Sequence, residues 1–271
     1  MKPARLNPVF HEKIWGASHL EPWFRDTPEL TGEVWFATPE VLVKFLFTTG
    51  DLSVQVHPGD DYARVHESSA GKSEMWHILT AEAGAQIALG LVRPVTREEL
   101  ERAALDGSIT ELLRWIPVRA GDTFYIPAGV IHAIGAGISL CEIQQNSDVT
   151  YRLFDYGRGR ELHIDRSLDV AFLDGKHSGA AKPELLGPGR ELLVESPYFR
   201  TERLTFGGEY RVHSDGAAGG ELLIVLAGKG AIEEREYSQG QVWKIDPAAE
   251  VLVRSQGPST FLRCLYPALK N

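Results

Sequence analysis

Four side chains that could bind a metal ion lie in three short segments of the sequence. They are Gln55, His57, Glu74 and His132. Ser53, Gln55 and His57 alternate with apolar residues in the segment 52–58, and alternate side chains of a β-strand point to the same face. Glu74 precedes a second apolar run, which predicts a neighbouring strand. Two imidazoles, a carboxylate and an amide oxygen suit a borderline divalent ion such as Zn2+.

The segment around His132 carries the most specific motif. Residues 121–132 have the spacing G-x5-P-x-G-x2-H, which resembles the second half of the signature of the cupins, small β-barrels that carry a metal inside. The first half departs from that signature, because Gln55 stands where the first histidine of H-x-H is expected. A Gln-x-His pair resembles the type I mannose-6-phosphate isomerases (phosphomannose isomerases), in their short bacterial form. The motifs of that family follow in order at 52–58, 71–76, 127–134 and 142–152.

This resemblance covers residues 10–175 and implies both a cofactor and a reaction. Gln55, His57, Glu74 and His132 would bind about one Zn2+ per chain, with a coordination position open to water or substrate. The reaction would be the interconversion of mannose 6-phosphate and fructose 6-phosphate through an enediol. A lone histidine is more often structural than a ligand, and His77, three residues after Glu74, is expected on the opposite strand face.

The same resemblance implies three catalytic residues, Lys72, Glu142 and Arg152. Arg152 would lie over the reacting carbons and stabilise the negative charge of an enediolate. Lys72 is the first choice for the group that transfers the proton and Glu142 is the second, although the sequence does not separate the two. Lys72 would be helped in this role if burial and the metal lowered its pKa. Without the resemblance, Lys72 is a solvated turn residue, Glu142 a buried structural acid and Arg152 a surface strand residue.

The phosphate of such a substrate would have to be held by side chains, because the sequence has no glycine-rich phosphate loop. Ser53 and Arg158 match family positions that contact this group. An arginine offers planar, bidentate donors to phosphate oxygens. Arg158 lies in Gly157-Arg158-Gly159-Arg160, however, and could equally be a solvated loop charge.

The elements that position these residues are predicted to be mainly β-strands. The 27 Gly and 15 Pro, set between short apolar runs, favour a barrel or a sandwich over a helical bundle. The resemblance implies a cupin-type β-barrel (jelly roll), and capping patterns predict a helical insertion over 96–105 and 108–115. A further helix is expected from Asp165 to Phe172. Beyond it, a shift to Gly and Pro over 174–190 predicts a domain boundary.

We therefore expect a metal-binding catalytic cupin domain over 1–178 and a smaller cupin-like C-terminal domain without metal ligands over 190–271. Cys141 and Cys264 are far apart and have no metal-site spacing, which favours two free buried thiols. The net charge of −9, with no Lys/Arg cluster, makes nucleic acid an unexpected partner. The sequence shows no secretion signal and no membrane span. We expect a cytoplasmic monomer or homodimer that binds a small-molecule sugar phosphate.

Two other functions stay open. A non-catalytic sugar-phosphate-binding cupin would keep the cavity, although Lys72, Glu142 and Arg152 would be free to drift in a pure binder. A cupin metal dioxygenase would prefer iron, and Gln55 in place of a histidine disfavours it. The motifs of serine hydrolases, P-loop NTPases and Rossmann dehydrogenases do not occur in the sequence.

Overall fold

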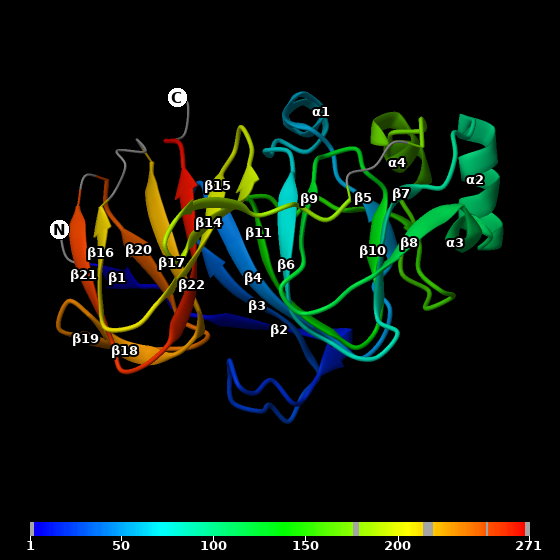
Figure 1. Cartoon of the computed structure of the whole chain (residues 1–271). Coiled ribbons are helices and arrows are strands. Elements are labelled where there is room, and N and C mark those ends of the chain that lie inside the picture. The colour runs from blue at the N-terminus through cyan, green and yellow to red at the C-terminus, as the bar shows by residue number, and fades with distance from the viewer. Residues whose placement is uncertain (1–2, 176–178, 214–218, 248, 269–271) are drawn as a thin grey trace.

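The computed structural model describes residues 3–175, 179–213, 219–247 and 249–268. These residues form four antiparallel sheets and several short helices in successive layers (Figure 1). The layers are a 4-stranded sheet, a 7-stranded sheet, a 6-stranded sheet, a 5-stranded sheet and the helices. A separate hydrophobic cluster fills each space between neighbouring layers. The protein is therefore mainly β, as the sequence predicts.

The 6-stranded sheet lies in the middle of the molecule. Its strand order is β2 (Val9–Ala17), β3 (Thr31–Ala37), β4 (Val41–Thr48), β11 (Ile138–Gln145), β6 (Glu74–Ala81) and β9 (Thr123–Ile126). Strand β4 is buried along its whole length, and its branched and aromatic residues favour a strand that packs on both faces. Val43 and Phe45 face the 7-stranded sheet, whereas Leu46 faces the 5-stranded sheet. Alternate side chains of the same strand thus serve different cores.

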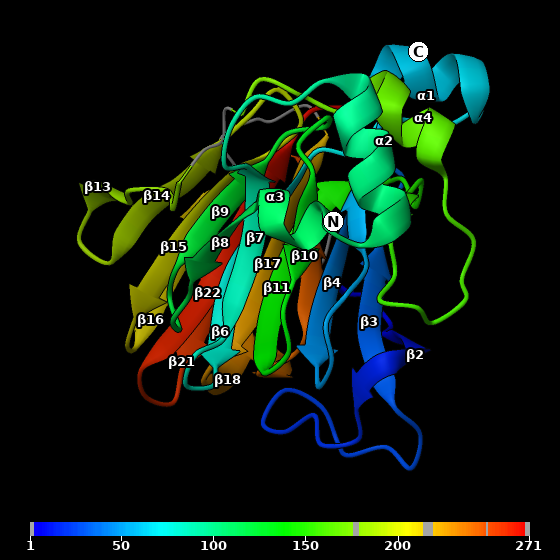
Figure 2. The same ribbon diagram turned by 90° about the vertical axis from the view of Figure 1, so that its right-hand side faces the viewer.

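The 5-stranded sheet carries the helices on its outer face (Figure 2). Its strand order is β12 (Tyr151–Phe154), β5 (Val54–Val56), β10 (His132–Ile134), β7 (Gln86–Leu91) and β8 (Leu113–Pro117). The helices are α1 (Asp60–His66), α2 (Arg97–Asp106), α3 (Ile109–Leu112) and α4 (Ile164–Val170). Within the described residues, no helix combines the length and the apolar character that a membrane crossing requires.

The helix predicted over 96–105 is confirmed as α2, where the Thr96 hydroxyl accepts a hydrogen bond from the Glu99 backbone N–H. The helix predicted over 108–115 is wrong in its second half, because α3 ends at Leu112 and β8 follows. Pairing of 113–117 with β7 decides this, since ladder hydrogen bonds outweigh local helix propensity. The helix predicted from Asp165 to Phe172 corresponds to α4. The observed helix begins one residue earlier, at Ile164. It ends at Val170, because the Phe172 backbone N–H donates a hydrogen bond to the Gly129 carbonyl.

The C-terminal half contains the other two sheets. The 7-stranded sheet has the order β1 (Ala4–Arg5), β20 (Val242–Ile245), β17 (Gly220–Ala227), β22 (Ser259–Tyr266), β15 (Arg200–Phe206), β14 (Arg190–Glu195) and β13 (Glu184–Gly187). The 4-stranded sheet has the order β16 (Glu209–His213), β21 (Glu250–Ser255), β18 (Lys229–Ile232) and β19 (Arg235–Ser238). Large apolar side chains, including Trp243 and Phe261, fill the space between them.

The two halves share a hydrophobic core. Val34 and Phe45 of the 6-stranded sheet pack with Leu222 and Leu262 of the 7-stranded sheet, and both cysteines are free and buried in this cluster. Strand β1 pairs with β20, so the start of the chain joins the C-terminal sheet. The predicted interdomain segment 174–190 contains strand β13. The domain division stays a prediction, and residue 178, its first limit, lies outside the described residues.

Candidate active site

The space between the 6-stranded and 5-stranded sheets is apolar at one end and polar at the other. Trp76 on β6 and Leu140 on β11 belong to the hydrophobic cluster inside this space. Glu74 precedes Trp76 by two residues and Glu142 follows Leu140 by two, so all of them share the inward face. Both carboxylates are buried, with 0% and 4% of their surface exposed. Strand periodicity thus carries two acids into the interior of the barrel.

The 5-stranded sheet supplies the facing side chains. Gln55 lies between Val54 and Val56, which contact the helices, so its amide points the other way, into the barrel. His132 on β10 stands directly opposite Gln55 in the ladder, and their Nε2 atoms are 3.3 Å apart. His57, two residues after Gln55, completes this group. Register and alternation together therefore gather the residues that the sequence predicts as metal ligands.

Donor atoms of His57, Glu74 and His132 all lie within 4.8 Å of one another, and the three residues are buried. Nε2 of His132 is 3.4 Å from Oε1 of Glu74, and Nε2 of His57 is 3.6 Å from Oε2 of the same carboxylate. Nδ1 of each imidazole lies 2.9 Å from a backbone carbonyl oxygen, that of Val149 or Val130. A carbonyl can only accept, so Nδ1 carries the proton and the Nε2 lone pairs face the cluster.

These residues fit a divalent metal. Oε1 of Glu74 is buried and accepts no hydrogen bond from the described residues. Burial lowers the pKa of His132 to about 4. Burial and the charge of Lys72 lower the pKa of His57 well below its usual value. Both imidazoles are therefore neutral, which is the form that can bind a metal ion. Burial and the nearby Glu142 raise the pKa of Glu74 to about 7, a direction that a cation would reverse. The donor set already holds one cation, the Lys72 ammonium, which is 2.6 Å from Glu74 Oε2 and 2.9 Å from His57 Nε2.

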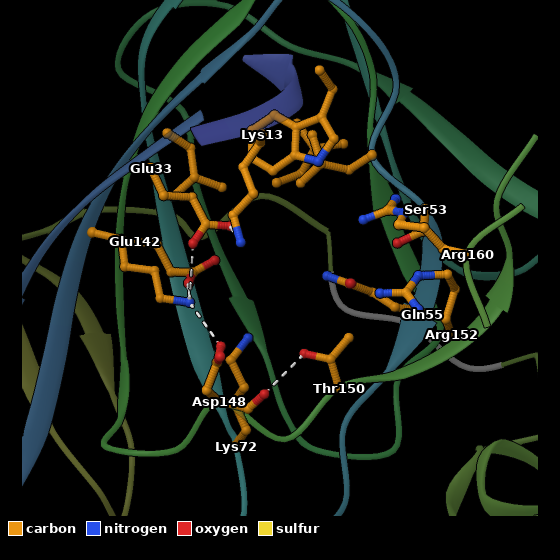
Figure 3. A pocket seen from close by; sticks show the side chains of 15 residues that line it. Lys13, Glu33, Ser53, Gln55, Lys72, Glu142, Asp148, Thr150, Arg152 and Arg160 are labelled. Carbon is orange, nitrogen blue, oxygen red and sulfur yellow. Dashed lines mark hydrogen bonds and ion pairs between the residues drawn. The ribbon is translucent and has the colours of Figure 1, made fainter. Parts of the chain in front are cut away.

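A cavity of about 260 Å3 adjoins the cluster (Figure 3). Lys72 and Gln55 lie between the two, because each lines the cavity and also contacts the cluster. The other polar lining residues are Lys13, Glu33, Lys44, Ser53, Glu142, Asp148, Thr150, Arg152 and Arg160. Ser53, Arg152 and Arg160 gather on one side, and Glu33 and Glu142 on the other (Figure 3). A polar, asymmetrically charged cavity beside a metal-binding cluster suits a small polar substrate.

Relatives of known name identify the family. No family model matches the sequence. The mannose-6-phosphate isomerase of Streptococcus mutans is 36% identical, over 85% of this chain and 87% of that protein. The mannose-6-phosphate isomerase ManA of Bacillus subtilis is 38% identical, over 87% of this chain and 89% of that protein. The chain belongs to the mannose-6-phosphate isomerase family.

The solved structure of the mannose 6-phosphate isomerase from Bacillus subtilis matches this member of the family over almost its whole length. The TM-score is 0.86 at 26% identity, covering 97% of this chain and 99% of that chain. The sequence-based resemblance to the isomerase family and the predicted cupin fold are both confirmed.

Most of the residues that the sequence predicts for the active site lie close together in the structure. Those in the cluster or lining the cavity are Gln55, His57, Glu74, His132, Lys72, Glu142, Arg152 and Ser53. Arg158 does not line the cavity. Its guanidinium is bound instead to Asp155 and to the carbonyl of Asp51. The roles assigned to all of these residues stay predictions.

The neighbouring carboxylates set the ionisation of Lys72. Burial lowers the pKa of its ammonium, but the negative charges of Glu74 and Glu142 outweigh burial and raise the pKa above its usual value. Burial therefore does not by itself bring about the lower pKa that would help Lys72 in proton transfer. Glu142 has the opposite balance: burial alone would raise its pKa, yet Lys72, Lys44 and the Trp76 N–H hold it below the usual value. At neutral pH this arrangement keeps Lys72 protonated and Glu142 ionised.

Lys44 is the principal site residue that the sequence reasoning left without a role. It is 4% exposed and its Nζ lies 3.5 Å from Glu142 Oε1, 3.9 Å from Glu33 Oε2 and 3.7 Å from Asp148 Oδ1. The signal was present, because Lys44 interrupts an otherwise apolar run over 41–47. A charged side chain in a fully buried strand requires a partner of opposite charge. For Lys44 these partners are the carboxylates at the polar end of the barrel.

His77 lies on the opposite face of β6 from Glu74, as predicted, and its Nδ1 is 2.8 Å from the Thr123 hydroxyl. Burial, and next the charge of Arg203, lower the pKa of His77 from 6.5 to about 4. The folded protein thus binds fewer protons than the unfolded chain between these pH values. The free energy of unfolding is therefore unaffected by His77 above pH 6.5. It decreases as the pH falls from 6.5 toward 4, because the unfolded chain takes up a proton at this histidine and the folded protein does not.

We expect His77→Gln to remove this part of the acid sensitivity, which amounts to ~3 kcal/mol by linkage. The measurement is the free energy of urea unfolding of both proteins across pH 4 to 6.5, with chelator present so that metal release does not contribute. The variant should show a shallower fall than the wild type. Parallel curves for the two proteins would show that His77 is not the group responsible.

Proposed function

We propose that this protein is a zinc-dependent aldose-ketose isomerase that interconverts mannose 6-phosphate and fructose 6-phosphate through an enediol. The observation that carries the proposal is the buried His57–Glu74–His132 cluster beside a polar cavity that holds both acids and bases. The relatives that bear the name mannose-6-phosphate isomerase support the same reaction. An isomerisation of this kind needs a proton acceptor and a means of stabilising negative charge on oxygen.

Gln55, His57, Glu74 and His132 would hold the Zn2+. Two neutral imidazoles and a carboxylate match the nitrogen and oxygen ligands of catalytic zinc sites, and the amide of Gln55 lies beside Nε2 of His132. Bound there, the ion would act as a Lewis acid that polarises substrate oxygens. The hydrogen bonds from the two Nδ1 atoms to backbone carbonyls keep the imidazoles oriented without it.

Lys72 and Glu142 are the proposed proton-transfer groups. Neighbouring cations hold the Glu142 carboxylate ionised, which supports Glu142 as a base. Its Oε2 accepts a hydrogen bond of 2.9 Å from the Trp76 indole N–H, which fixes the carboxylate at the cavity wall. A protonated Lys72 would donate to a substrate oxygen. Lys44, 3.5 Å from Glu142, would keep Glu142 ionised when a substrate excludes water.

Arg152 is the proposed stabiliser of the enediolate. It stands opposite Gln55 in the β12–β5 ladder and lines the cavity. Nη1 is held by the Glu161 carbonyl at 2.7 Å, whereas Nε is buried and finds no hydrogen-bond partner among the described residues. A guanidinium anchored at one nitrogen can present the rest of its donors to a developing oxyanion. Ser53 and Arg158 stay the sequence-based prediction for the phosphate contacts.

An isomerase assay with mannose 6-phosphate, run beside metal analysis of the same sample, tests this proposal. We expect turnover that is lost on chelation and restored by Zn2+, with about one metal ion per chain. Full activity of metal-free protein would contradict the zinc assignment. Binding of mannose 6-phosphate without turnover would identify a non-catalytic binder, and iron with oxygen consumption would identify a dioxygenase.

A further inference from the structure

In the loop after β12, Arg158 and Arg160 both donate hydrogen bonds to the buried carboxylate of Asp155. Gly157 and Gly159 have φ values of 72° and 77°, in the left-handed region that glycine adopts without strain. Their alternation with Arg158 and Arg160 curls the loop so that both guanidinium groups return to Asp155, which is 3% exposed. Burial alone would raise the pKa of Asp155, but the two arginines hold it below its usual value. The ionised carboxylate with two cations leaves a net positive charge at this place.

The two arginines use their donors differently. Every nitrogen of Arg158 is occupied: Nε and Nη2 bind Asp155, and Nη1 binds the Asp51 carbonyl at 2.7 Å. Asp51 stands two residues before Ser53, so Arg158 ties the loop to the segment that carries this serine. Arg160 meets the Asp155 carboxylate through Nε at 2.8 Å and Nη2 at 2.5 Å. Its Nη1 has no hydrogen-bond partner among the described residues and is free to bind a ligand.

Arg160 also lies where an anion would be attracted. It lines the cavity with Ser53 and Arg152, on the side opposite Glu33 and Glu142 (Figure 3). Burial and then the positive charge of Arg160 lower the pKa of Arg152, which reflects how close the two guanidinium groups lie. Two cations and a hydroxyl on a side of the cavity that carries none of its lining acids suit a dianionic phosphate.

We propose that Arg160, oriented by Asp155, binds the phosphate of the substrate, while Arg158 braces the loop; this rests on the proposed function. Asp155 is a positioning residue in this scheme. Its two oxygens accept hydrogen bonds from Nε and Nη2 of Arg160, which leaves Nη1 of this cavity-lining side chain available to a ligand. An arginine held in this way loses less rotamer freedom when the ligand binds, which favours affinity. The phosphate does not change during the isomerisation, so the loss of its contact should affect binding more than turnover.

Steady-state kinetics with mannose 6-phosphate and a calorimetric titration with inorganic phosphate test this assignment. Arg160→Ala should raise KM roughly 10- to 100-fold, the usual size of a charged hydrogen bond, with kcat changed by less than about threefold. It should weaken phosphate binding by a similar factor. Asp155→Asn should raise KM in the same direction but by less, because Arg160 keeps its charge and loses its alignment. Arg160→Lys should restore only part of the affinity, since an ammonium cannot bind in a bidentate way.

Arg97→Ala and Asp169→Asn are the matched controls, because they break an exposed pair of 2.9 Å that lies outside the cavity lining. Both should leave KM and phosphate binding at wild-type values. An unchanged KM in Arg160→Ala, or a larger rise in Arg158→Ala than in Arg160→Ala, would overturn the inference. A kcat loss equal to the KM rise in Asp155→Asn would do the same, because it indicates general unfolding of the site. If the wild type does not isomerise mannose 6-phosphate, the proposed function fails, and the phosphate titration still tests Arg160.

Discussion

Replacing His132 with alanine is expected to remove the bound metal and abolish turnover. Nε2 of this imidazole lies 3.4 Å from Oε1 of Glu74, and its Nδ1 donates a hydrogen bond to the Val130 carbonyl. No other described histidine besides His57 joins this donor set, so the protein cannot replace the lost nitrogen. Loss of groups that only orient a ligand already costs about 10- to 100-fold in metal affinity. Loss of the ligand itself should exceed that range.

The measurement is metal content per chain and kcat with mannose 6-phosphate, for His132→Ala and His57→Ala. His77→Ala is the matched control, since it removes a buried histidine from β6 on the face of that strand opposite Glu74. That variant should be less stable but should keep its metal. If His132→Ala retains metal and activity while His77→Ala loses both, the site has been placed on the wrong face of the 6-stranded sheet.

Arg152→Ala is expected to lower kcat by about 10²- to 10³-fold, the cost commonly seen when one oxyanion-stabilising donor is removed. Substrate affinity should change much less. The physical reason is that an enediolate exists only along the reaction path, and only interactions that are stronger in the transition state accelerate the chemical step. The partly satisfied guanidinium beside Gln55 has the position and the free donors for this role.

Steady-state kinetics beside a direct titration of substrate binding separate the two effects. Arg166→Ala supplies the matched control, because Arg166 pairs with Glu67 at 2.9 Å and does not line the cavity. It should keep wild-type kcat. An Arg152→Ala protein that loses affinity and keeps its kcat would show that Arg152 binds the ground state, and the assignment to the enediolate would be wrong.

The sequence by itself determined the mainly β fold, and with the family resemblance it predicted which residues form the candidate metal cluster. Strand alternation is a local property, so the order of residues along the chain is enough to assign Ser53, Gln55 and His57 to one face. The same argument separates His77 from Glu74. The motif around His132 depends on fixed offsets of Gly and Pro within one short segment, 121–132, and such offsets are visible in a single sequence. These inferences needed no contact between distant segments.

The tertiary structure alone decided which charged residues meet, because strand register sets those contacts and no local pattern encodes it. Lys44 belongs to the site because β11 pairs with β4 in the register that sets it opposite Glu142. The chain after α3 becomes a strand because β7 offers it a ladder, which outweighs its helix-forming residues. Local sequence does not separate the loop residues Arg158 and Arg160, and only the family resemblance singles out Arg158. The curl of their loop onto Asp155 turns one toward the fold and the other toward the cavity.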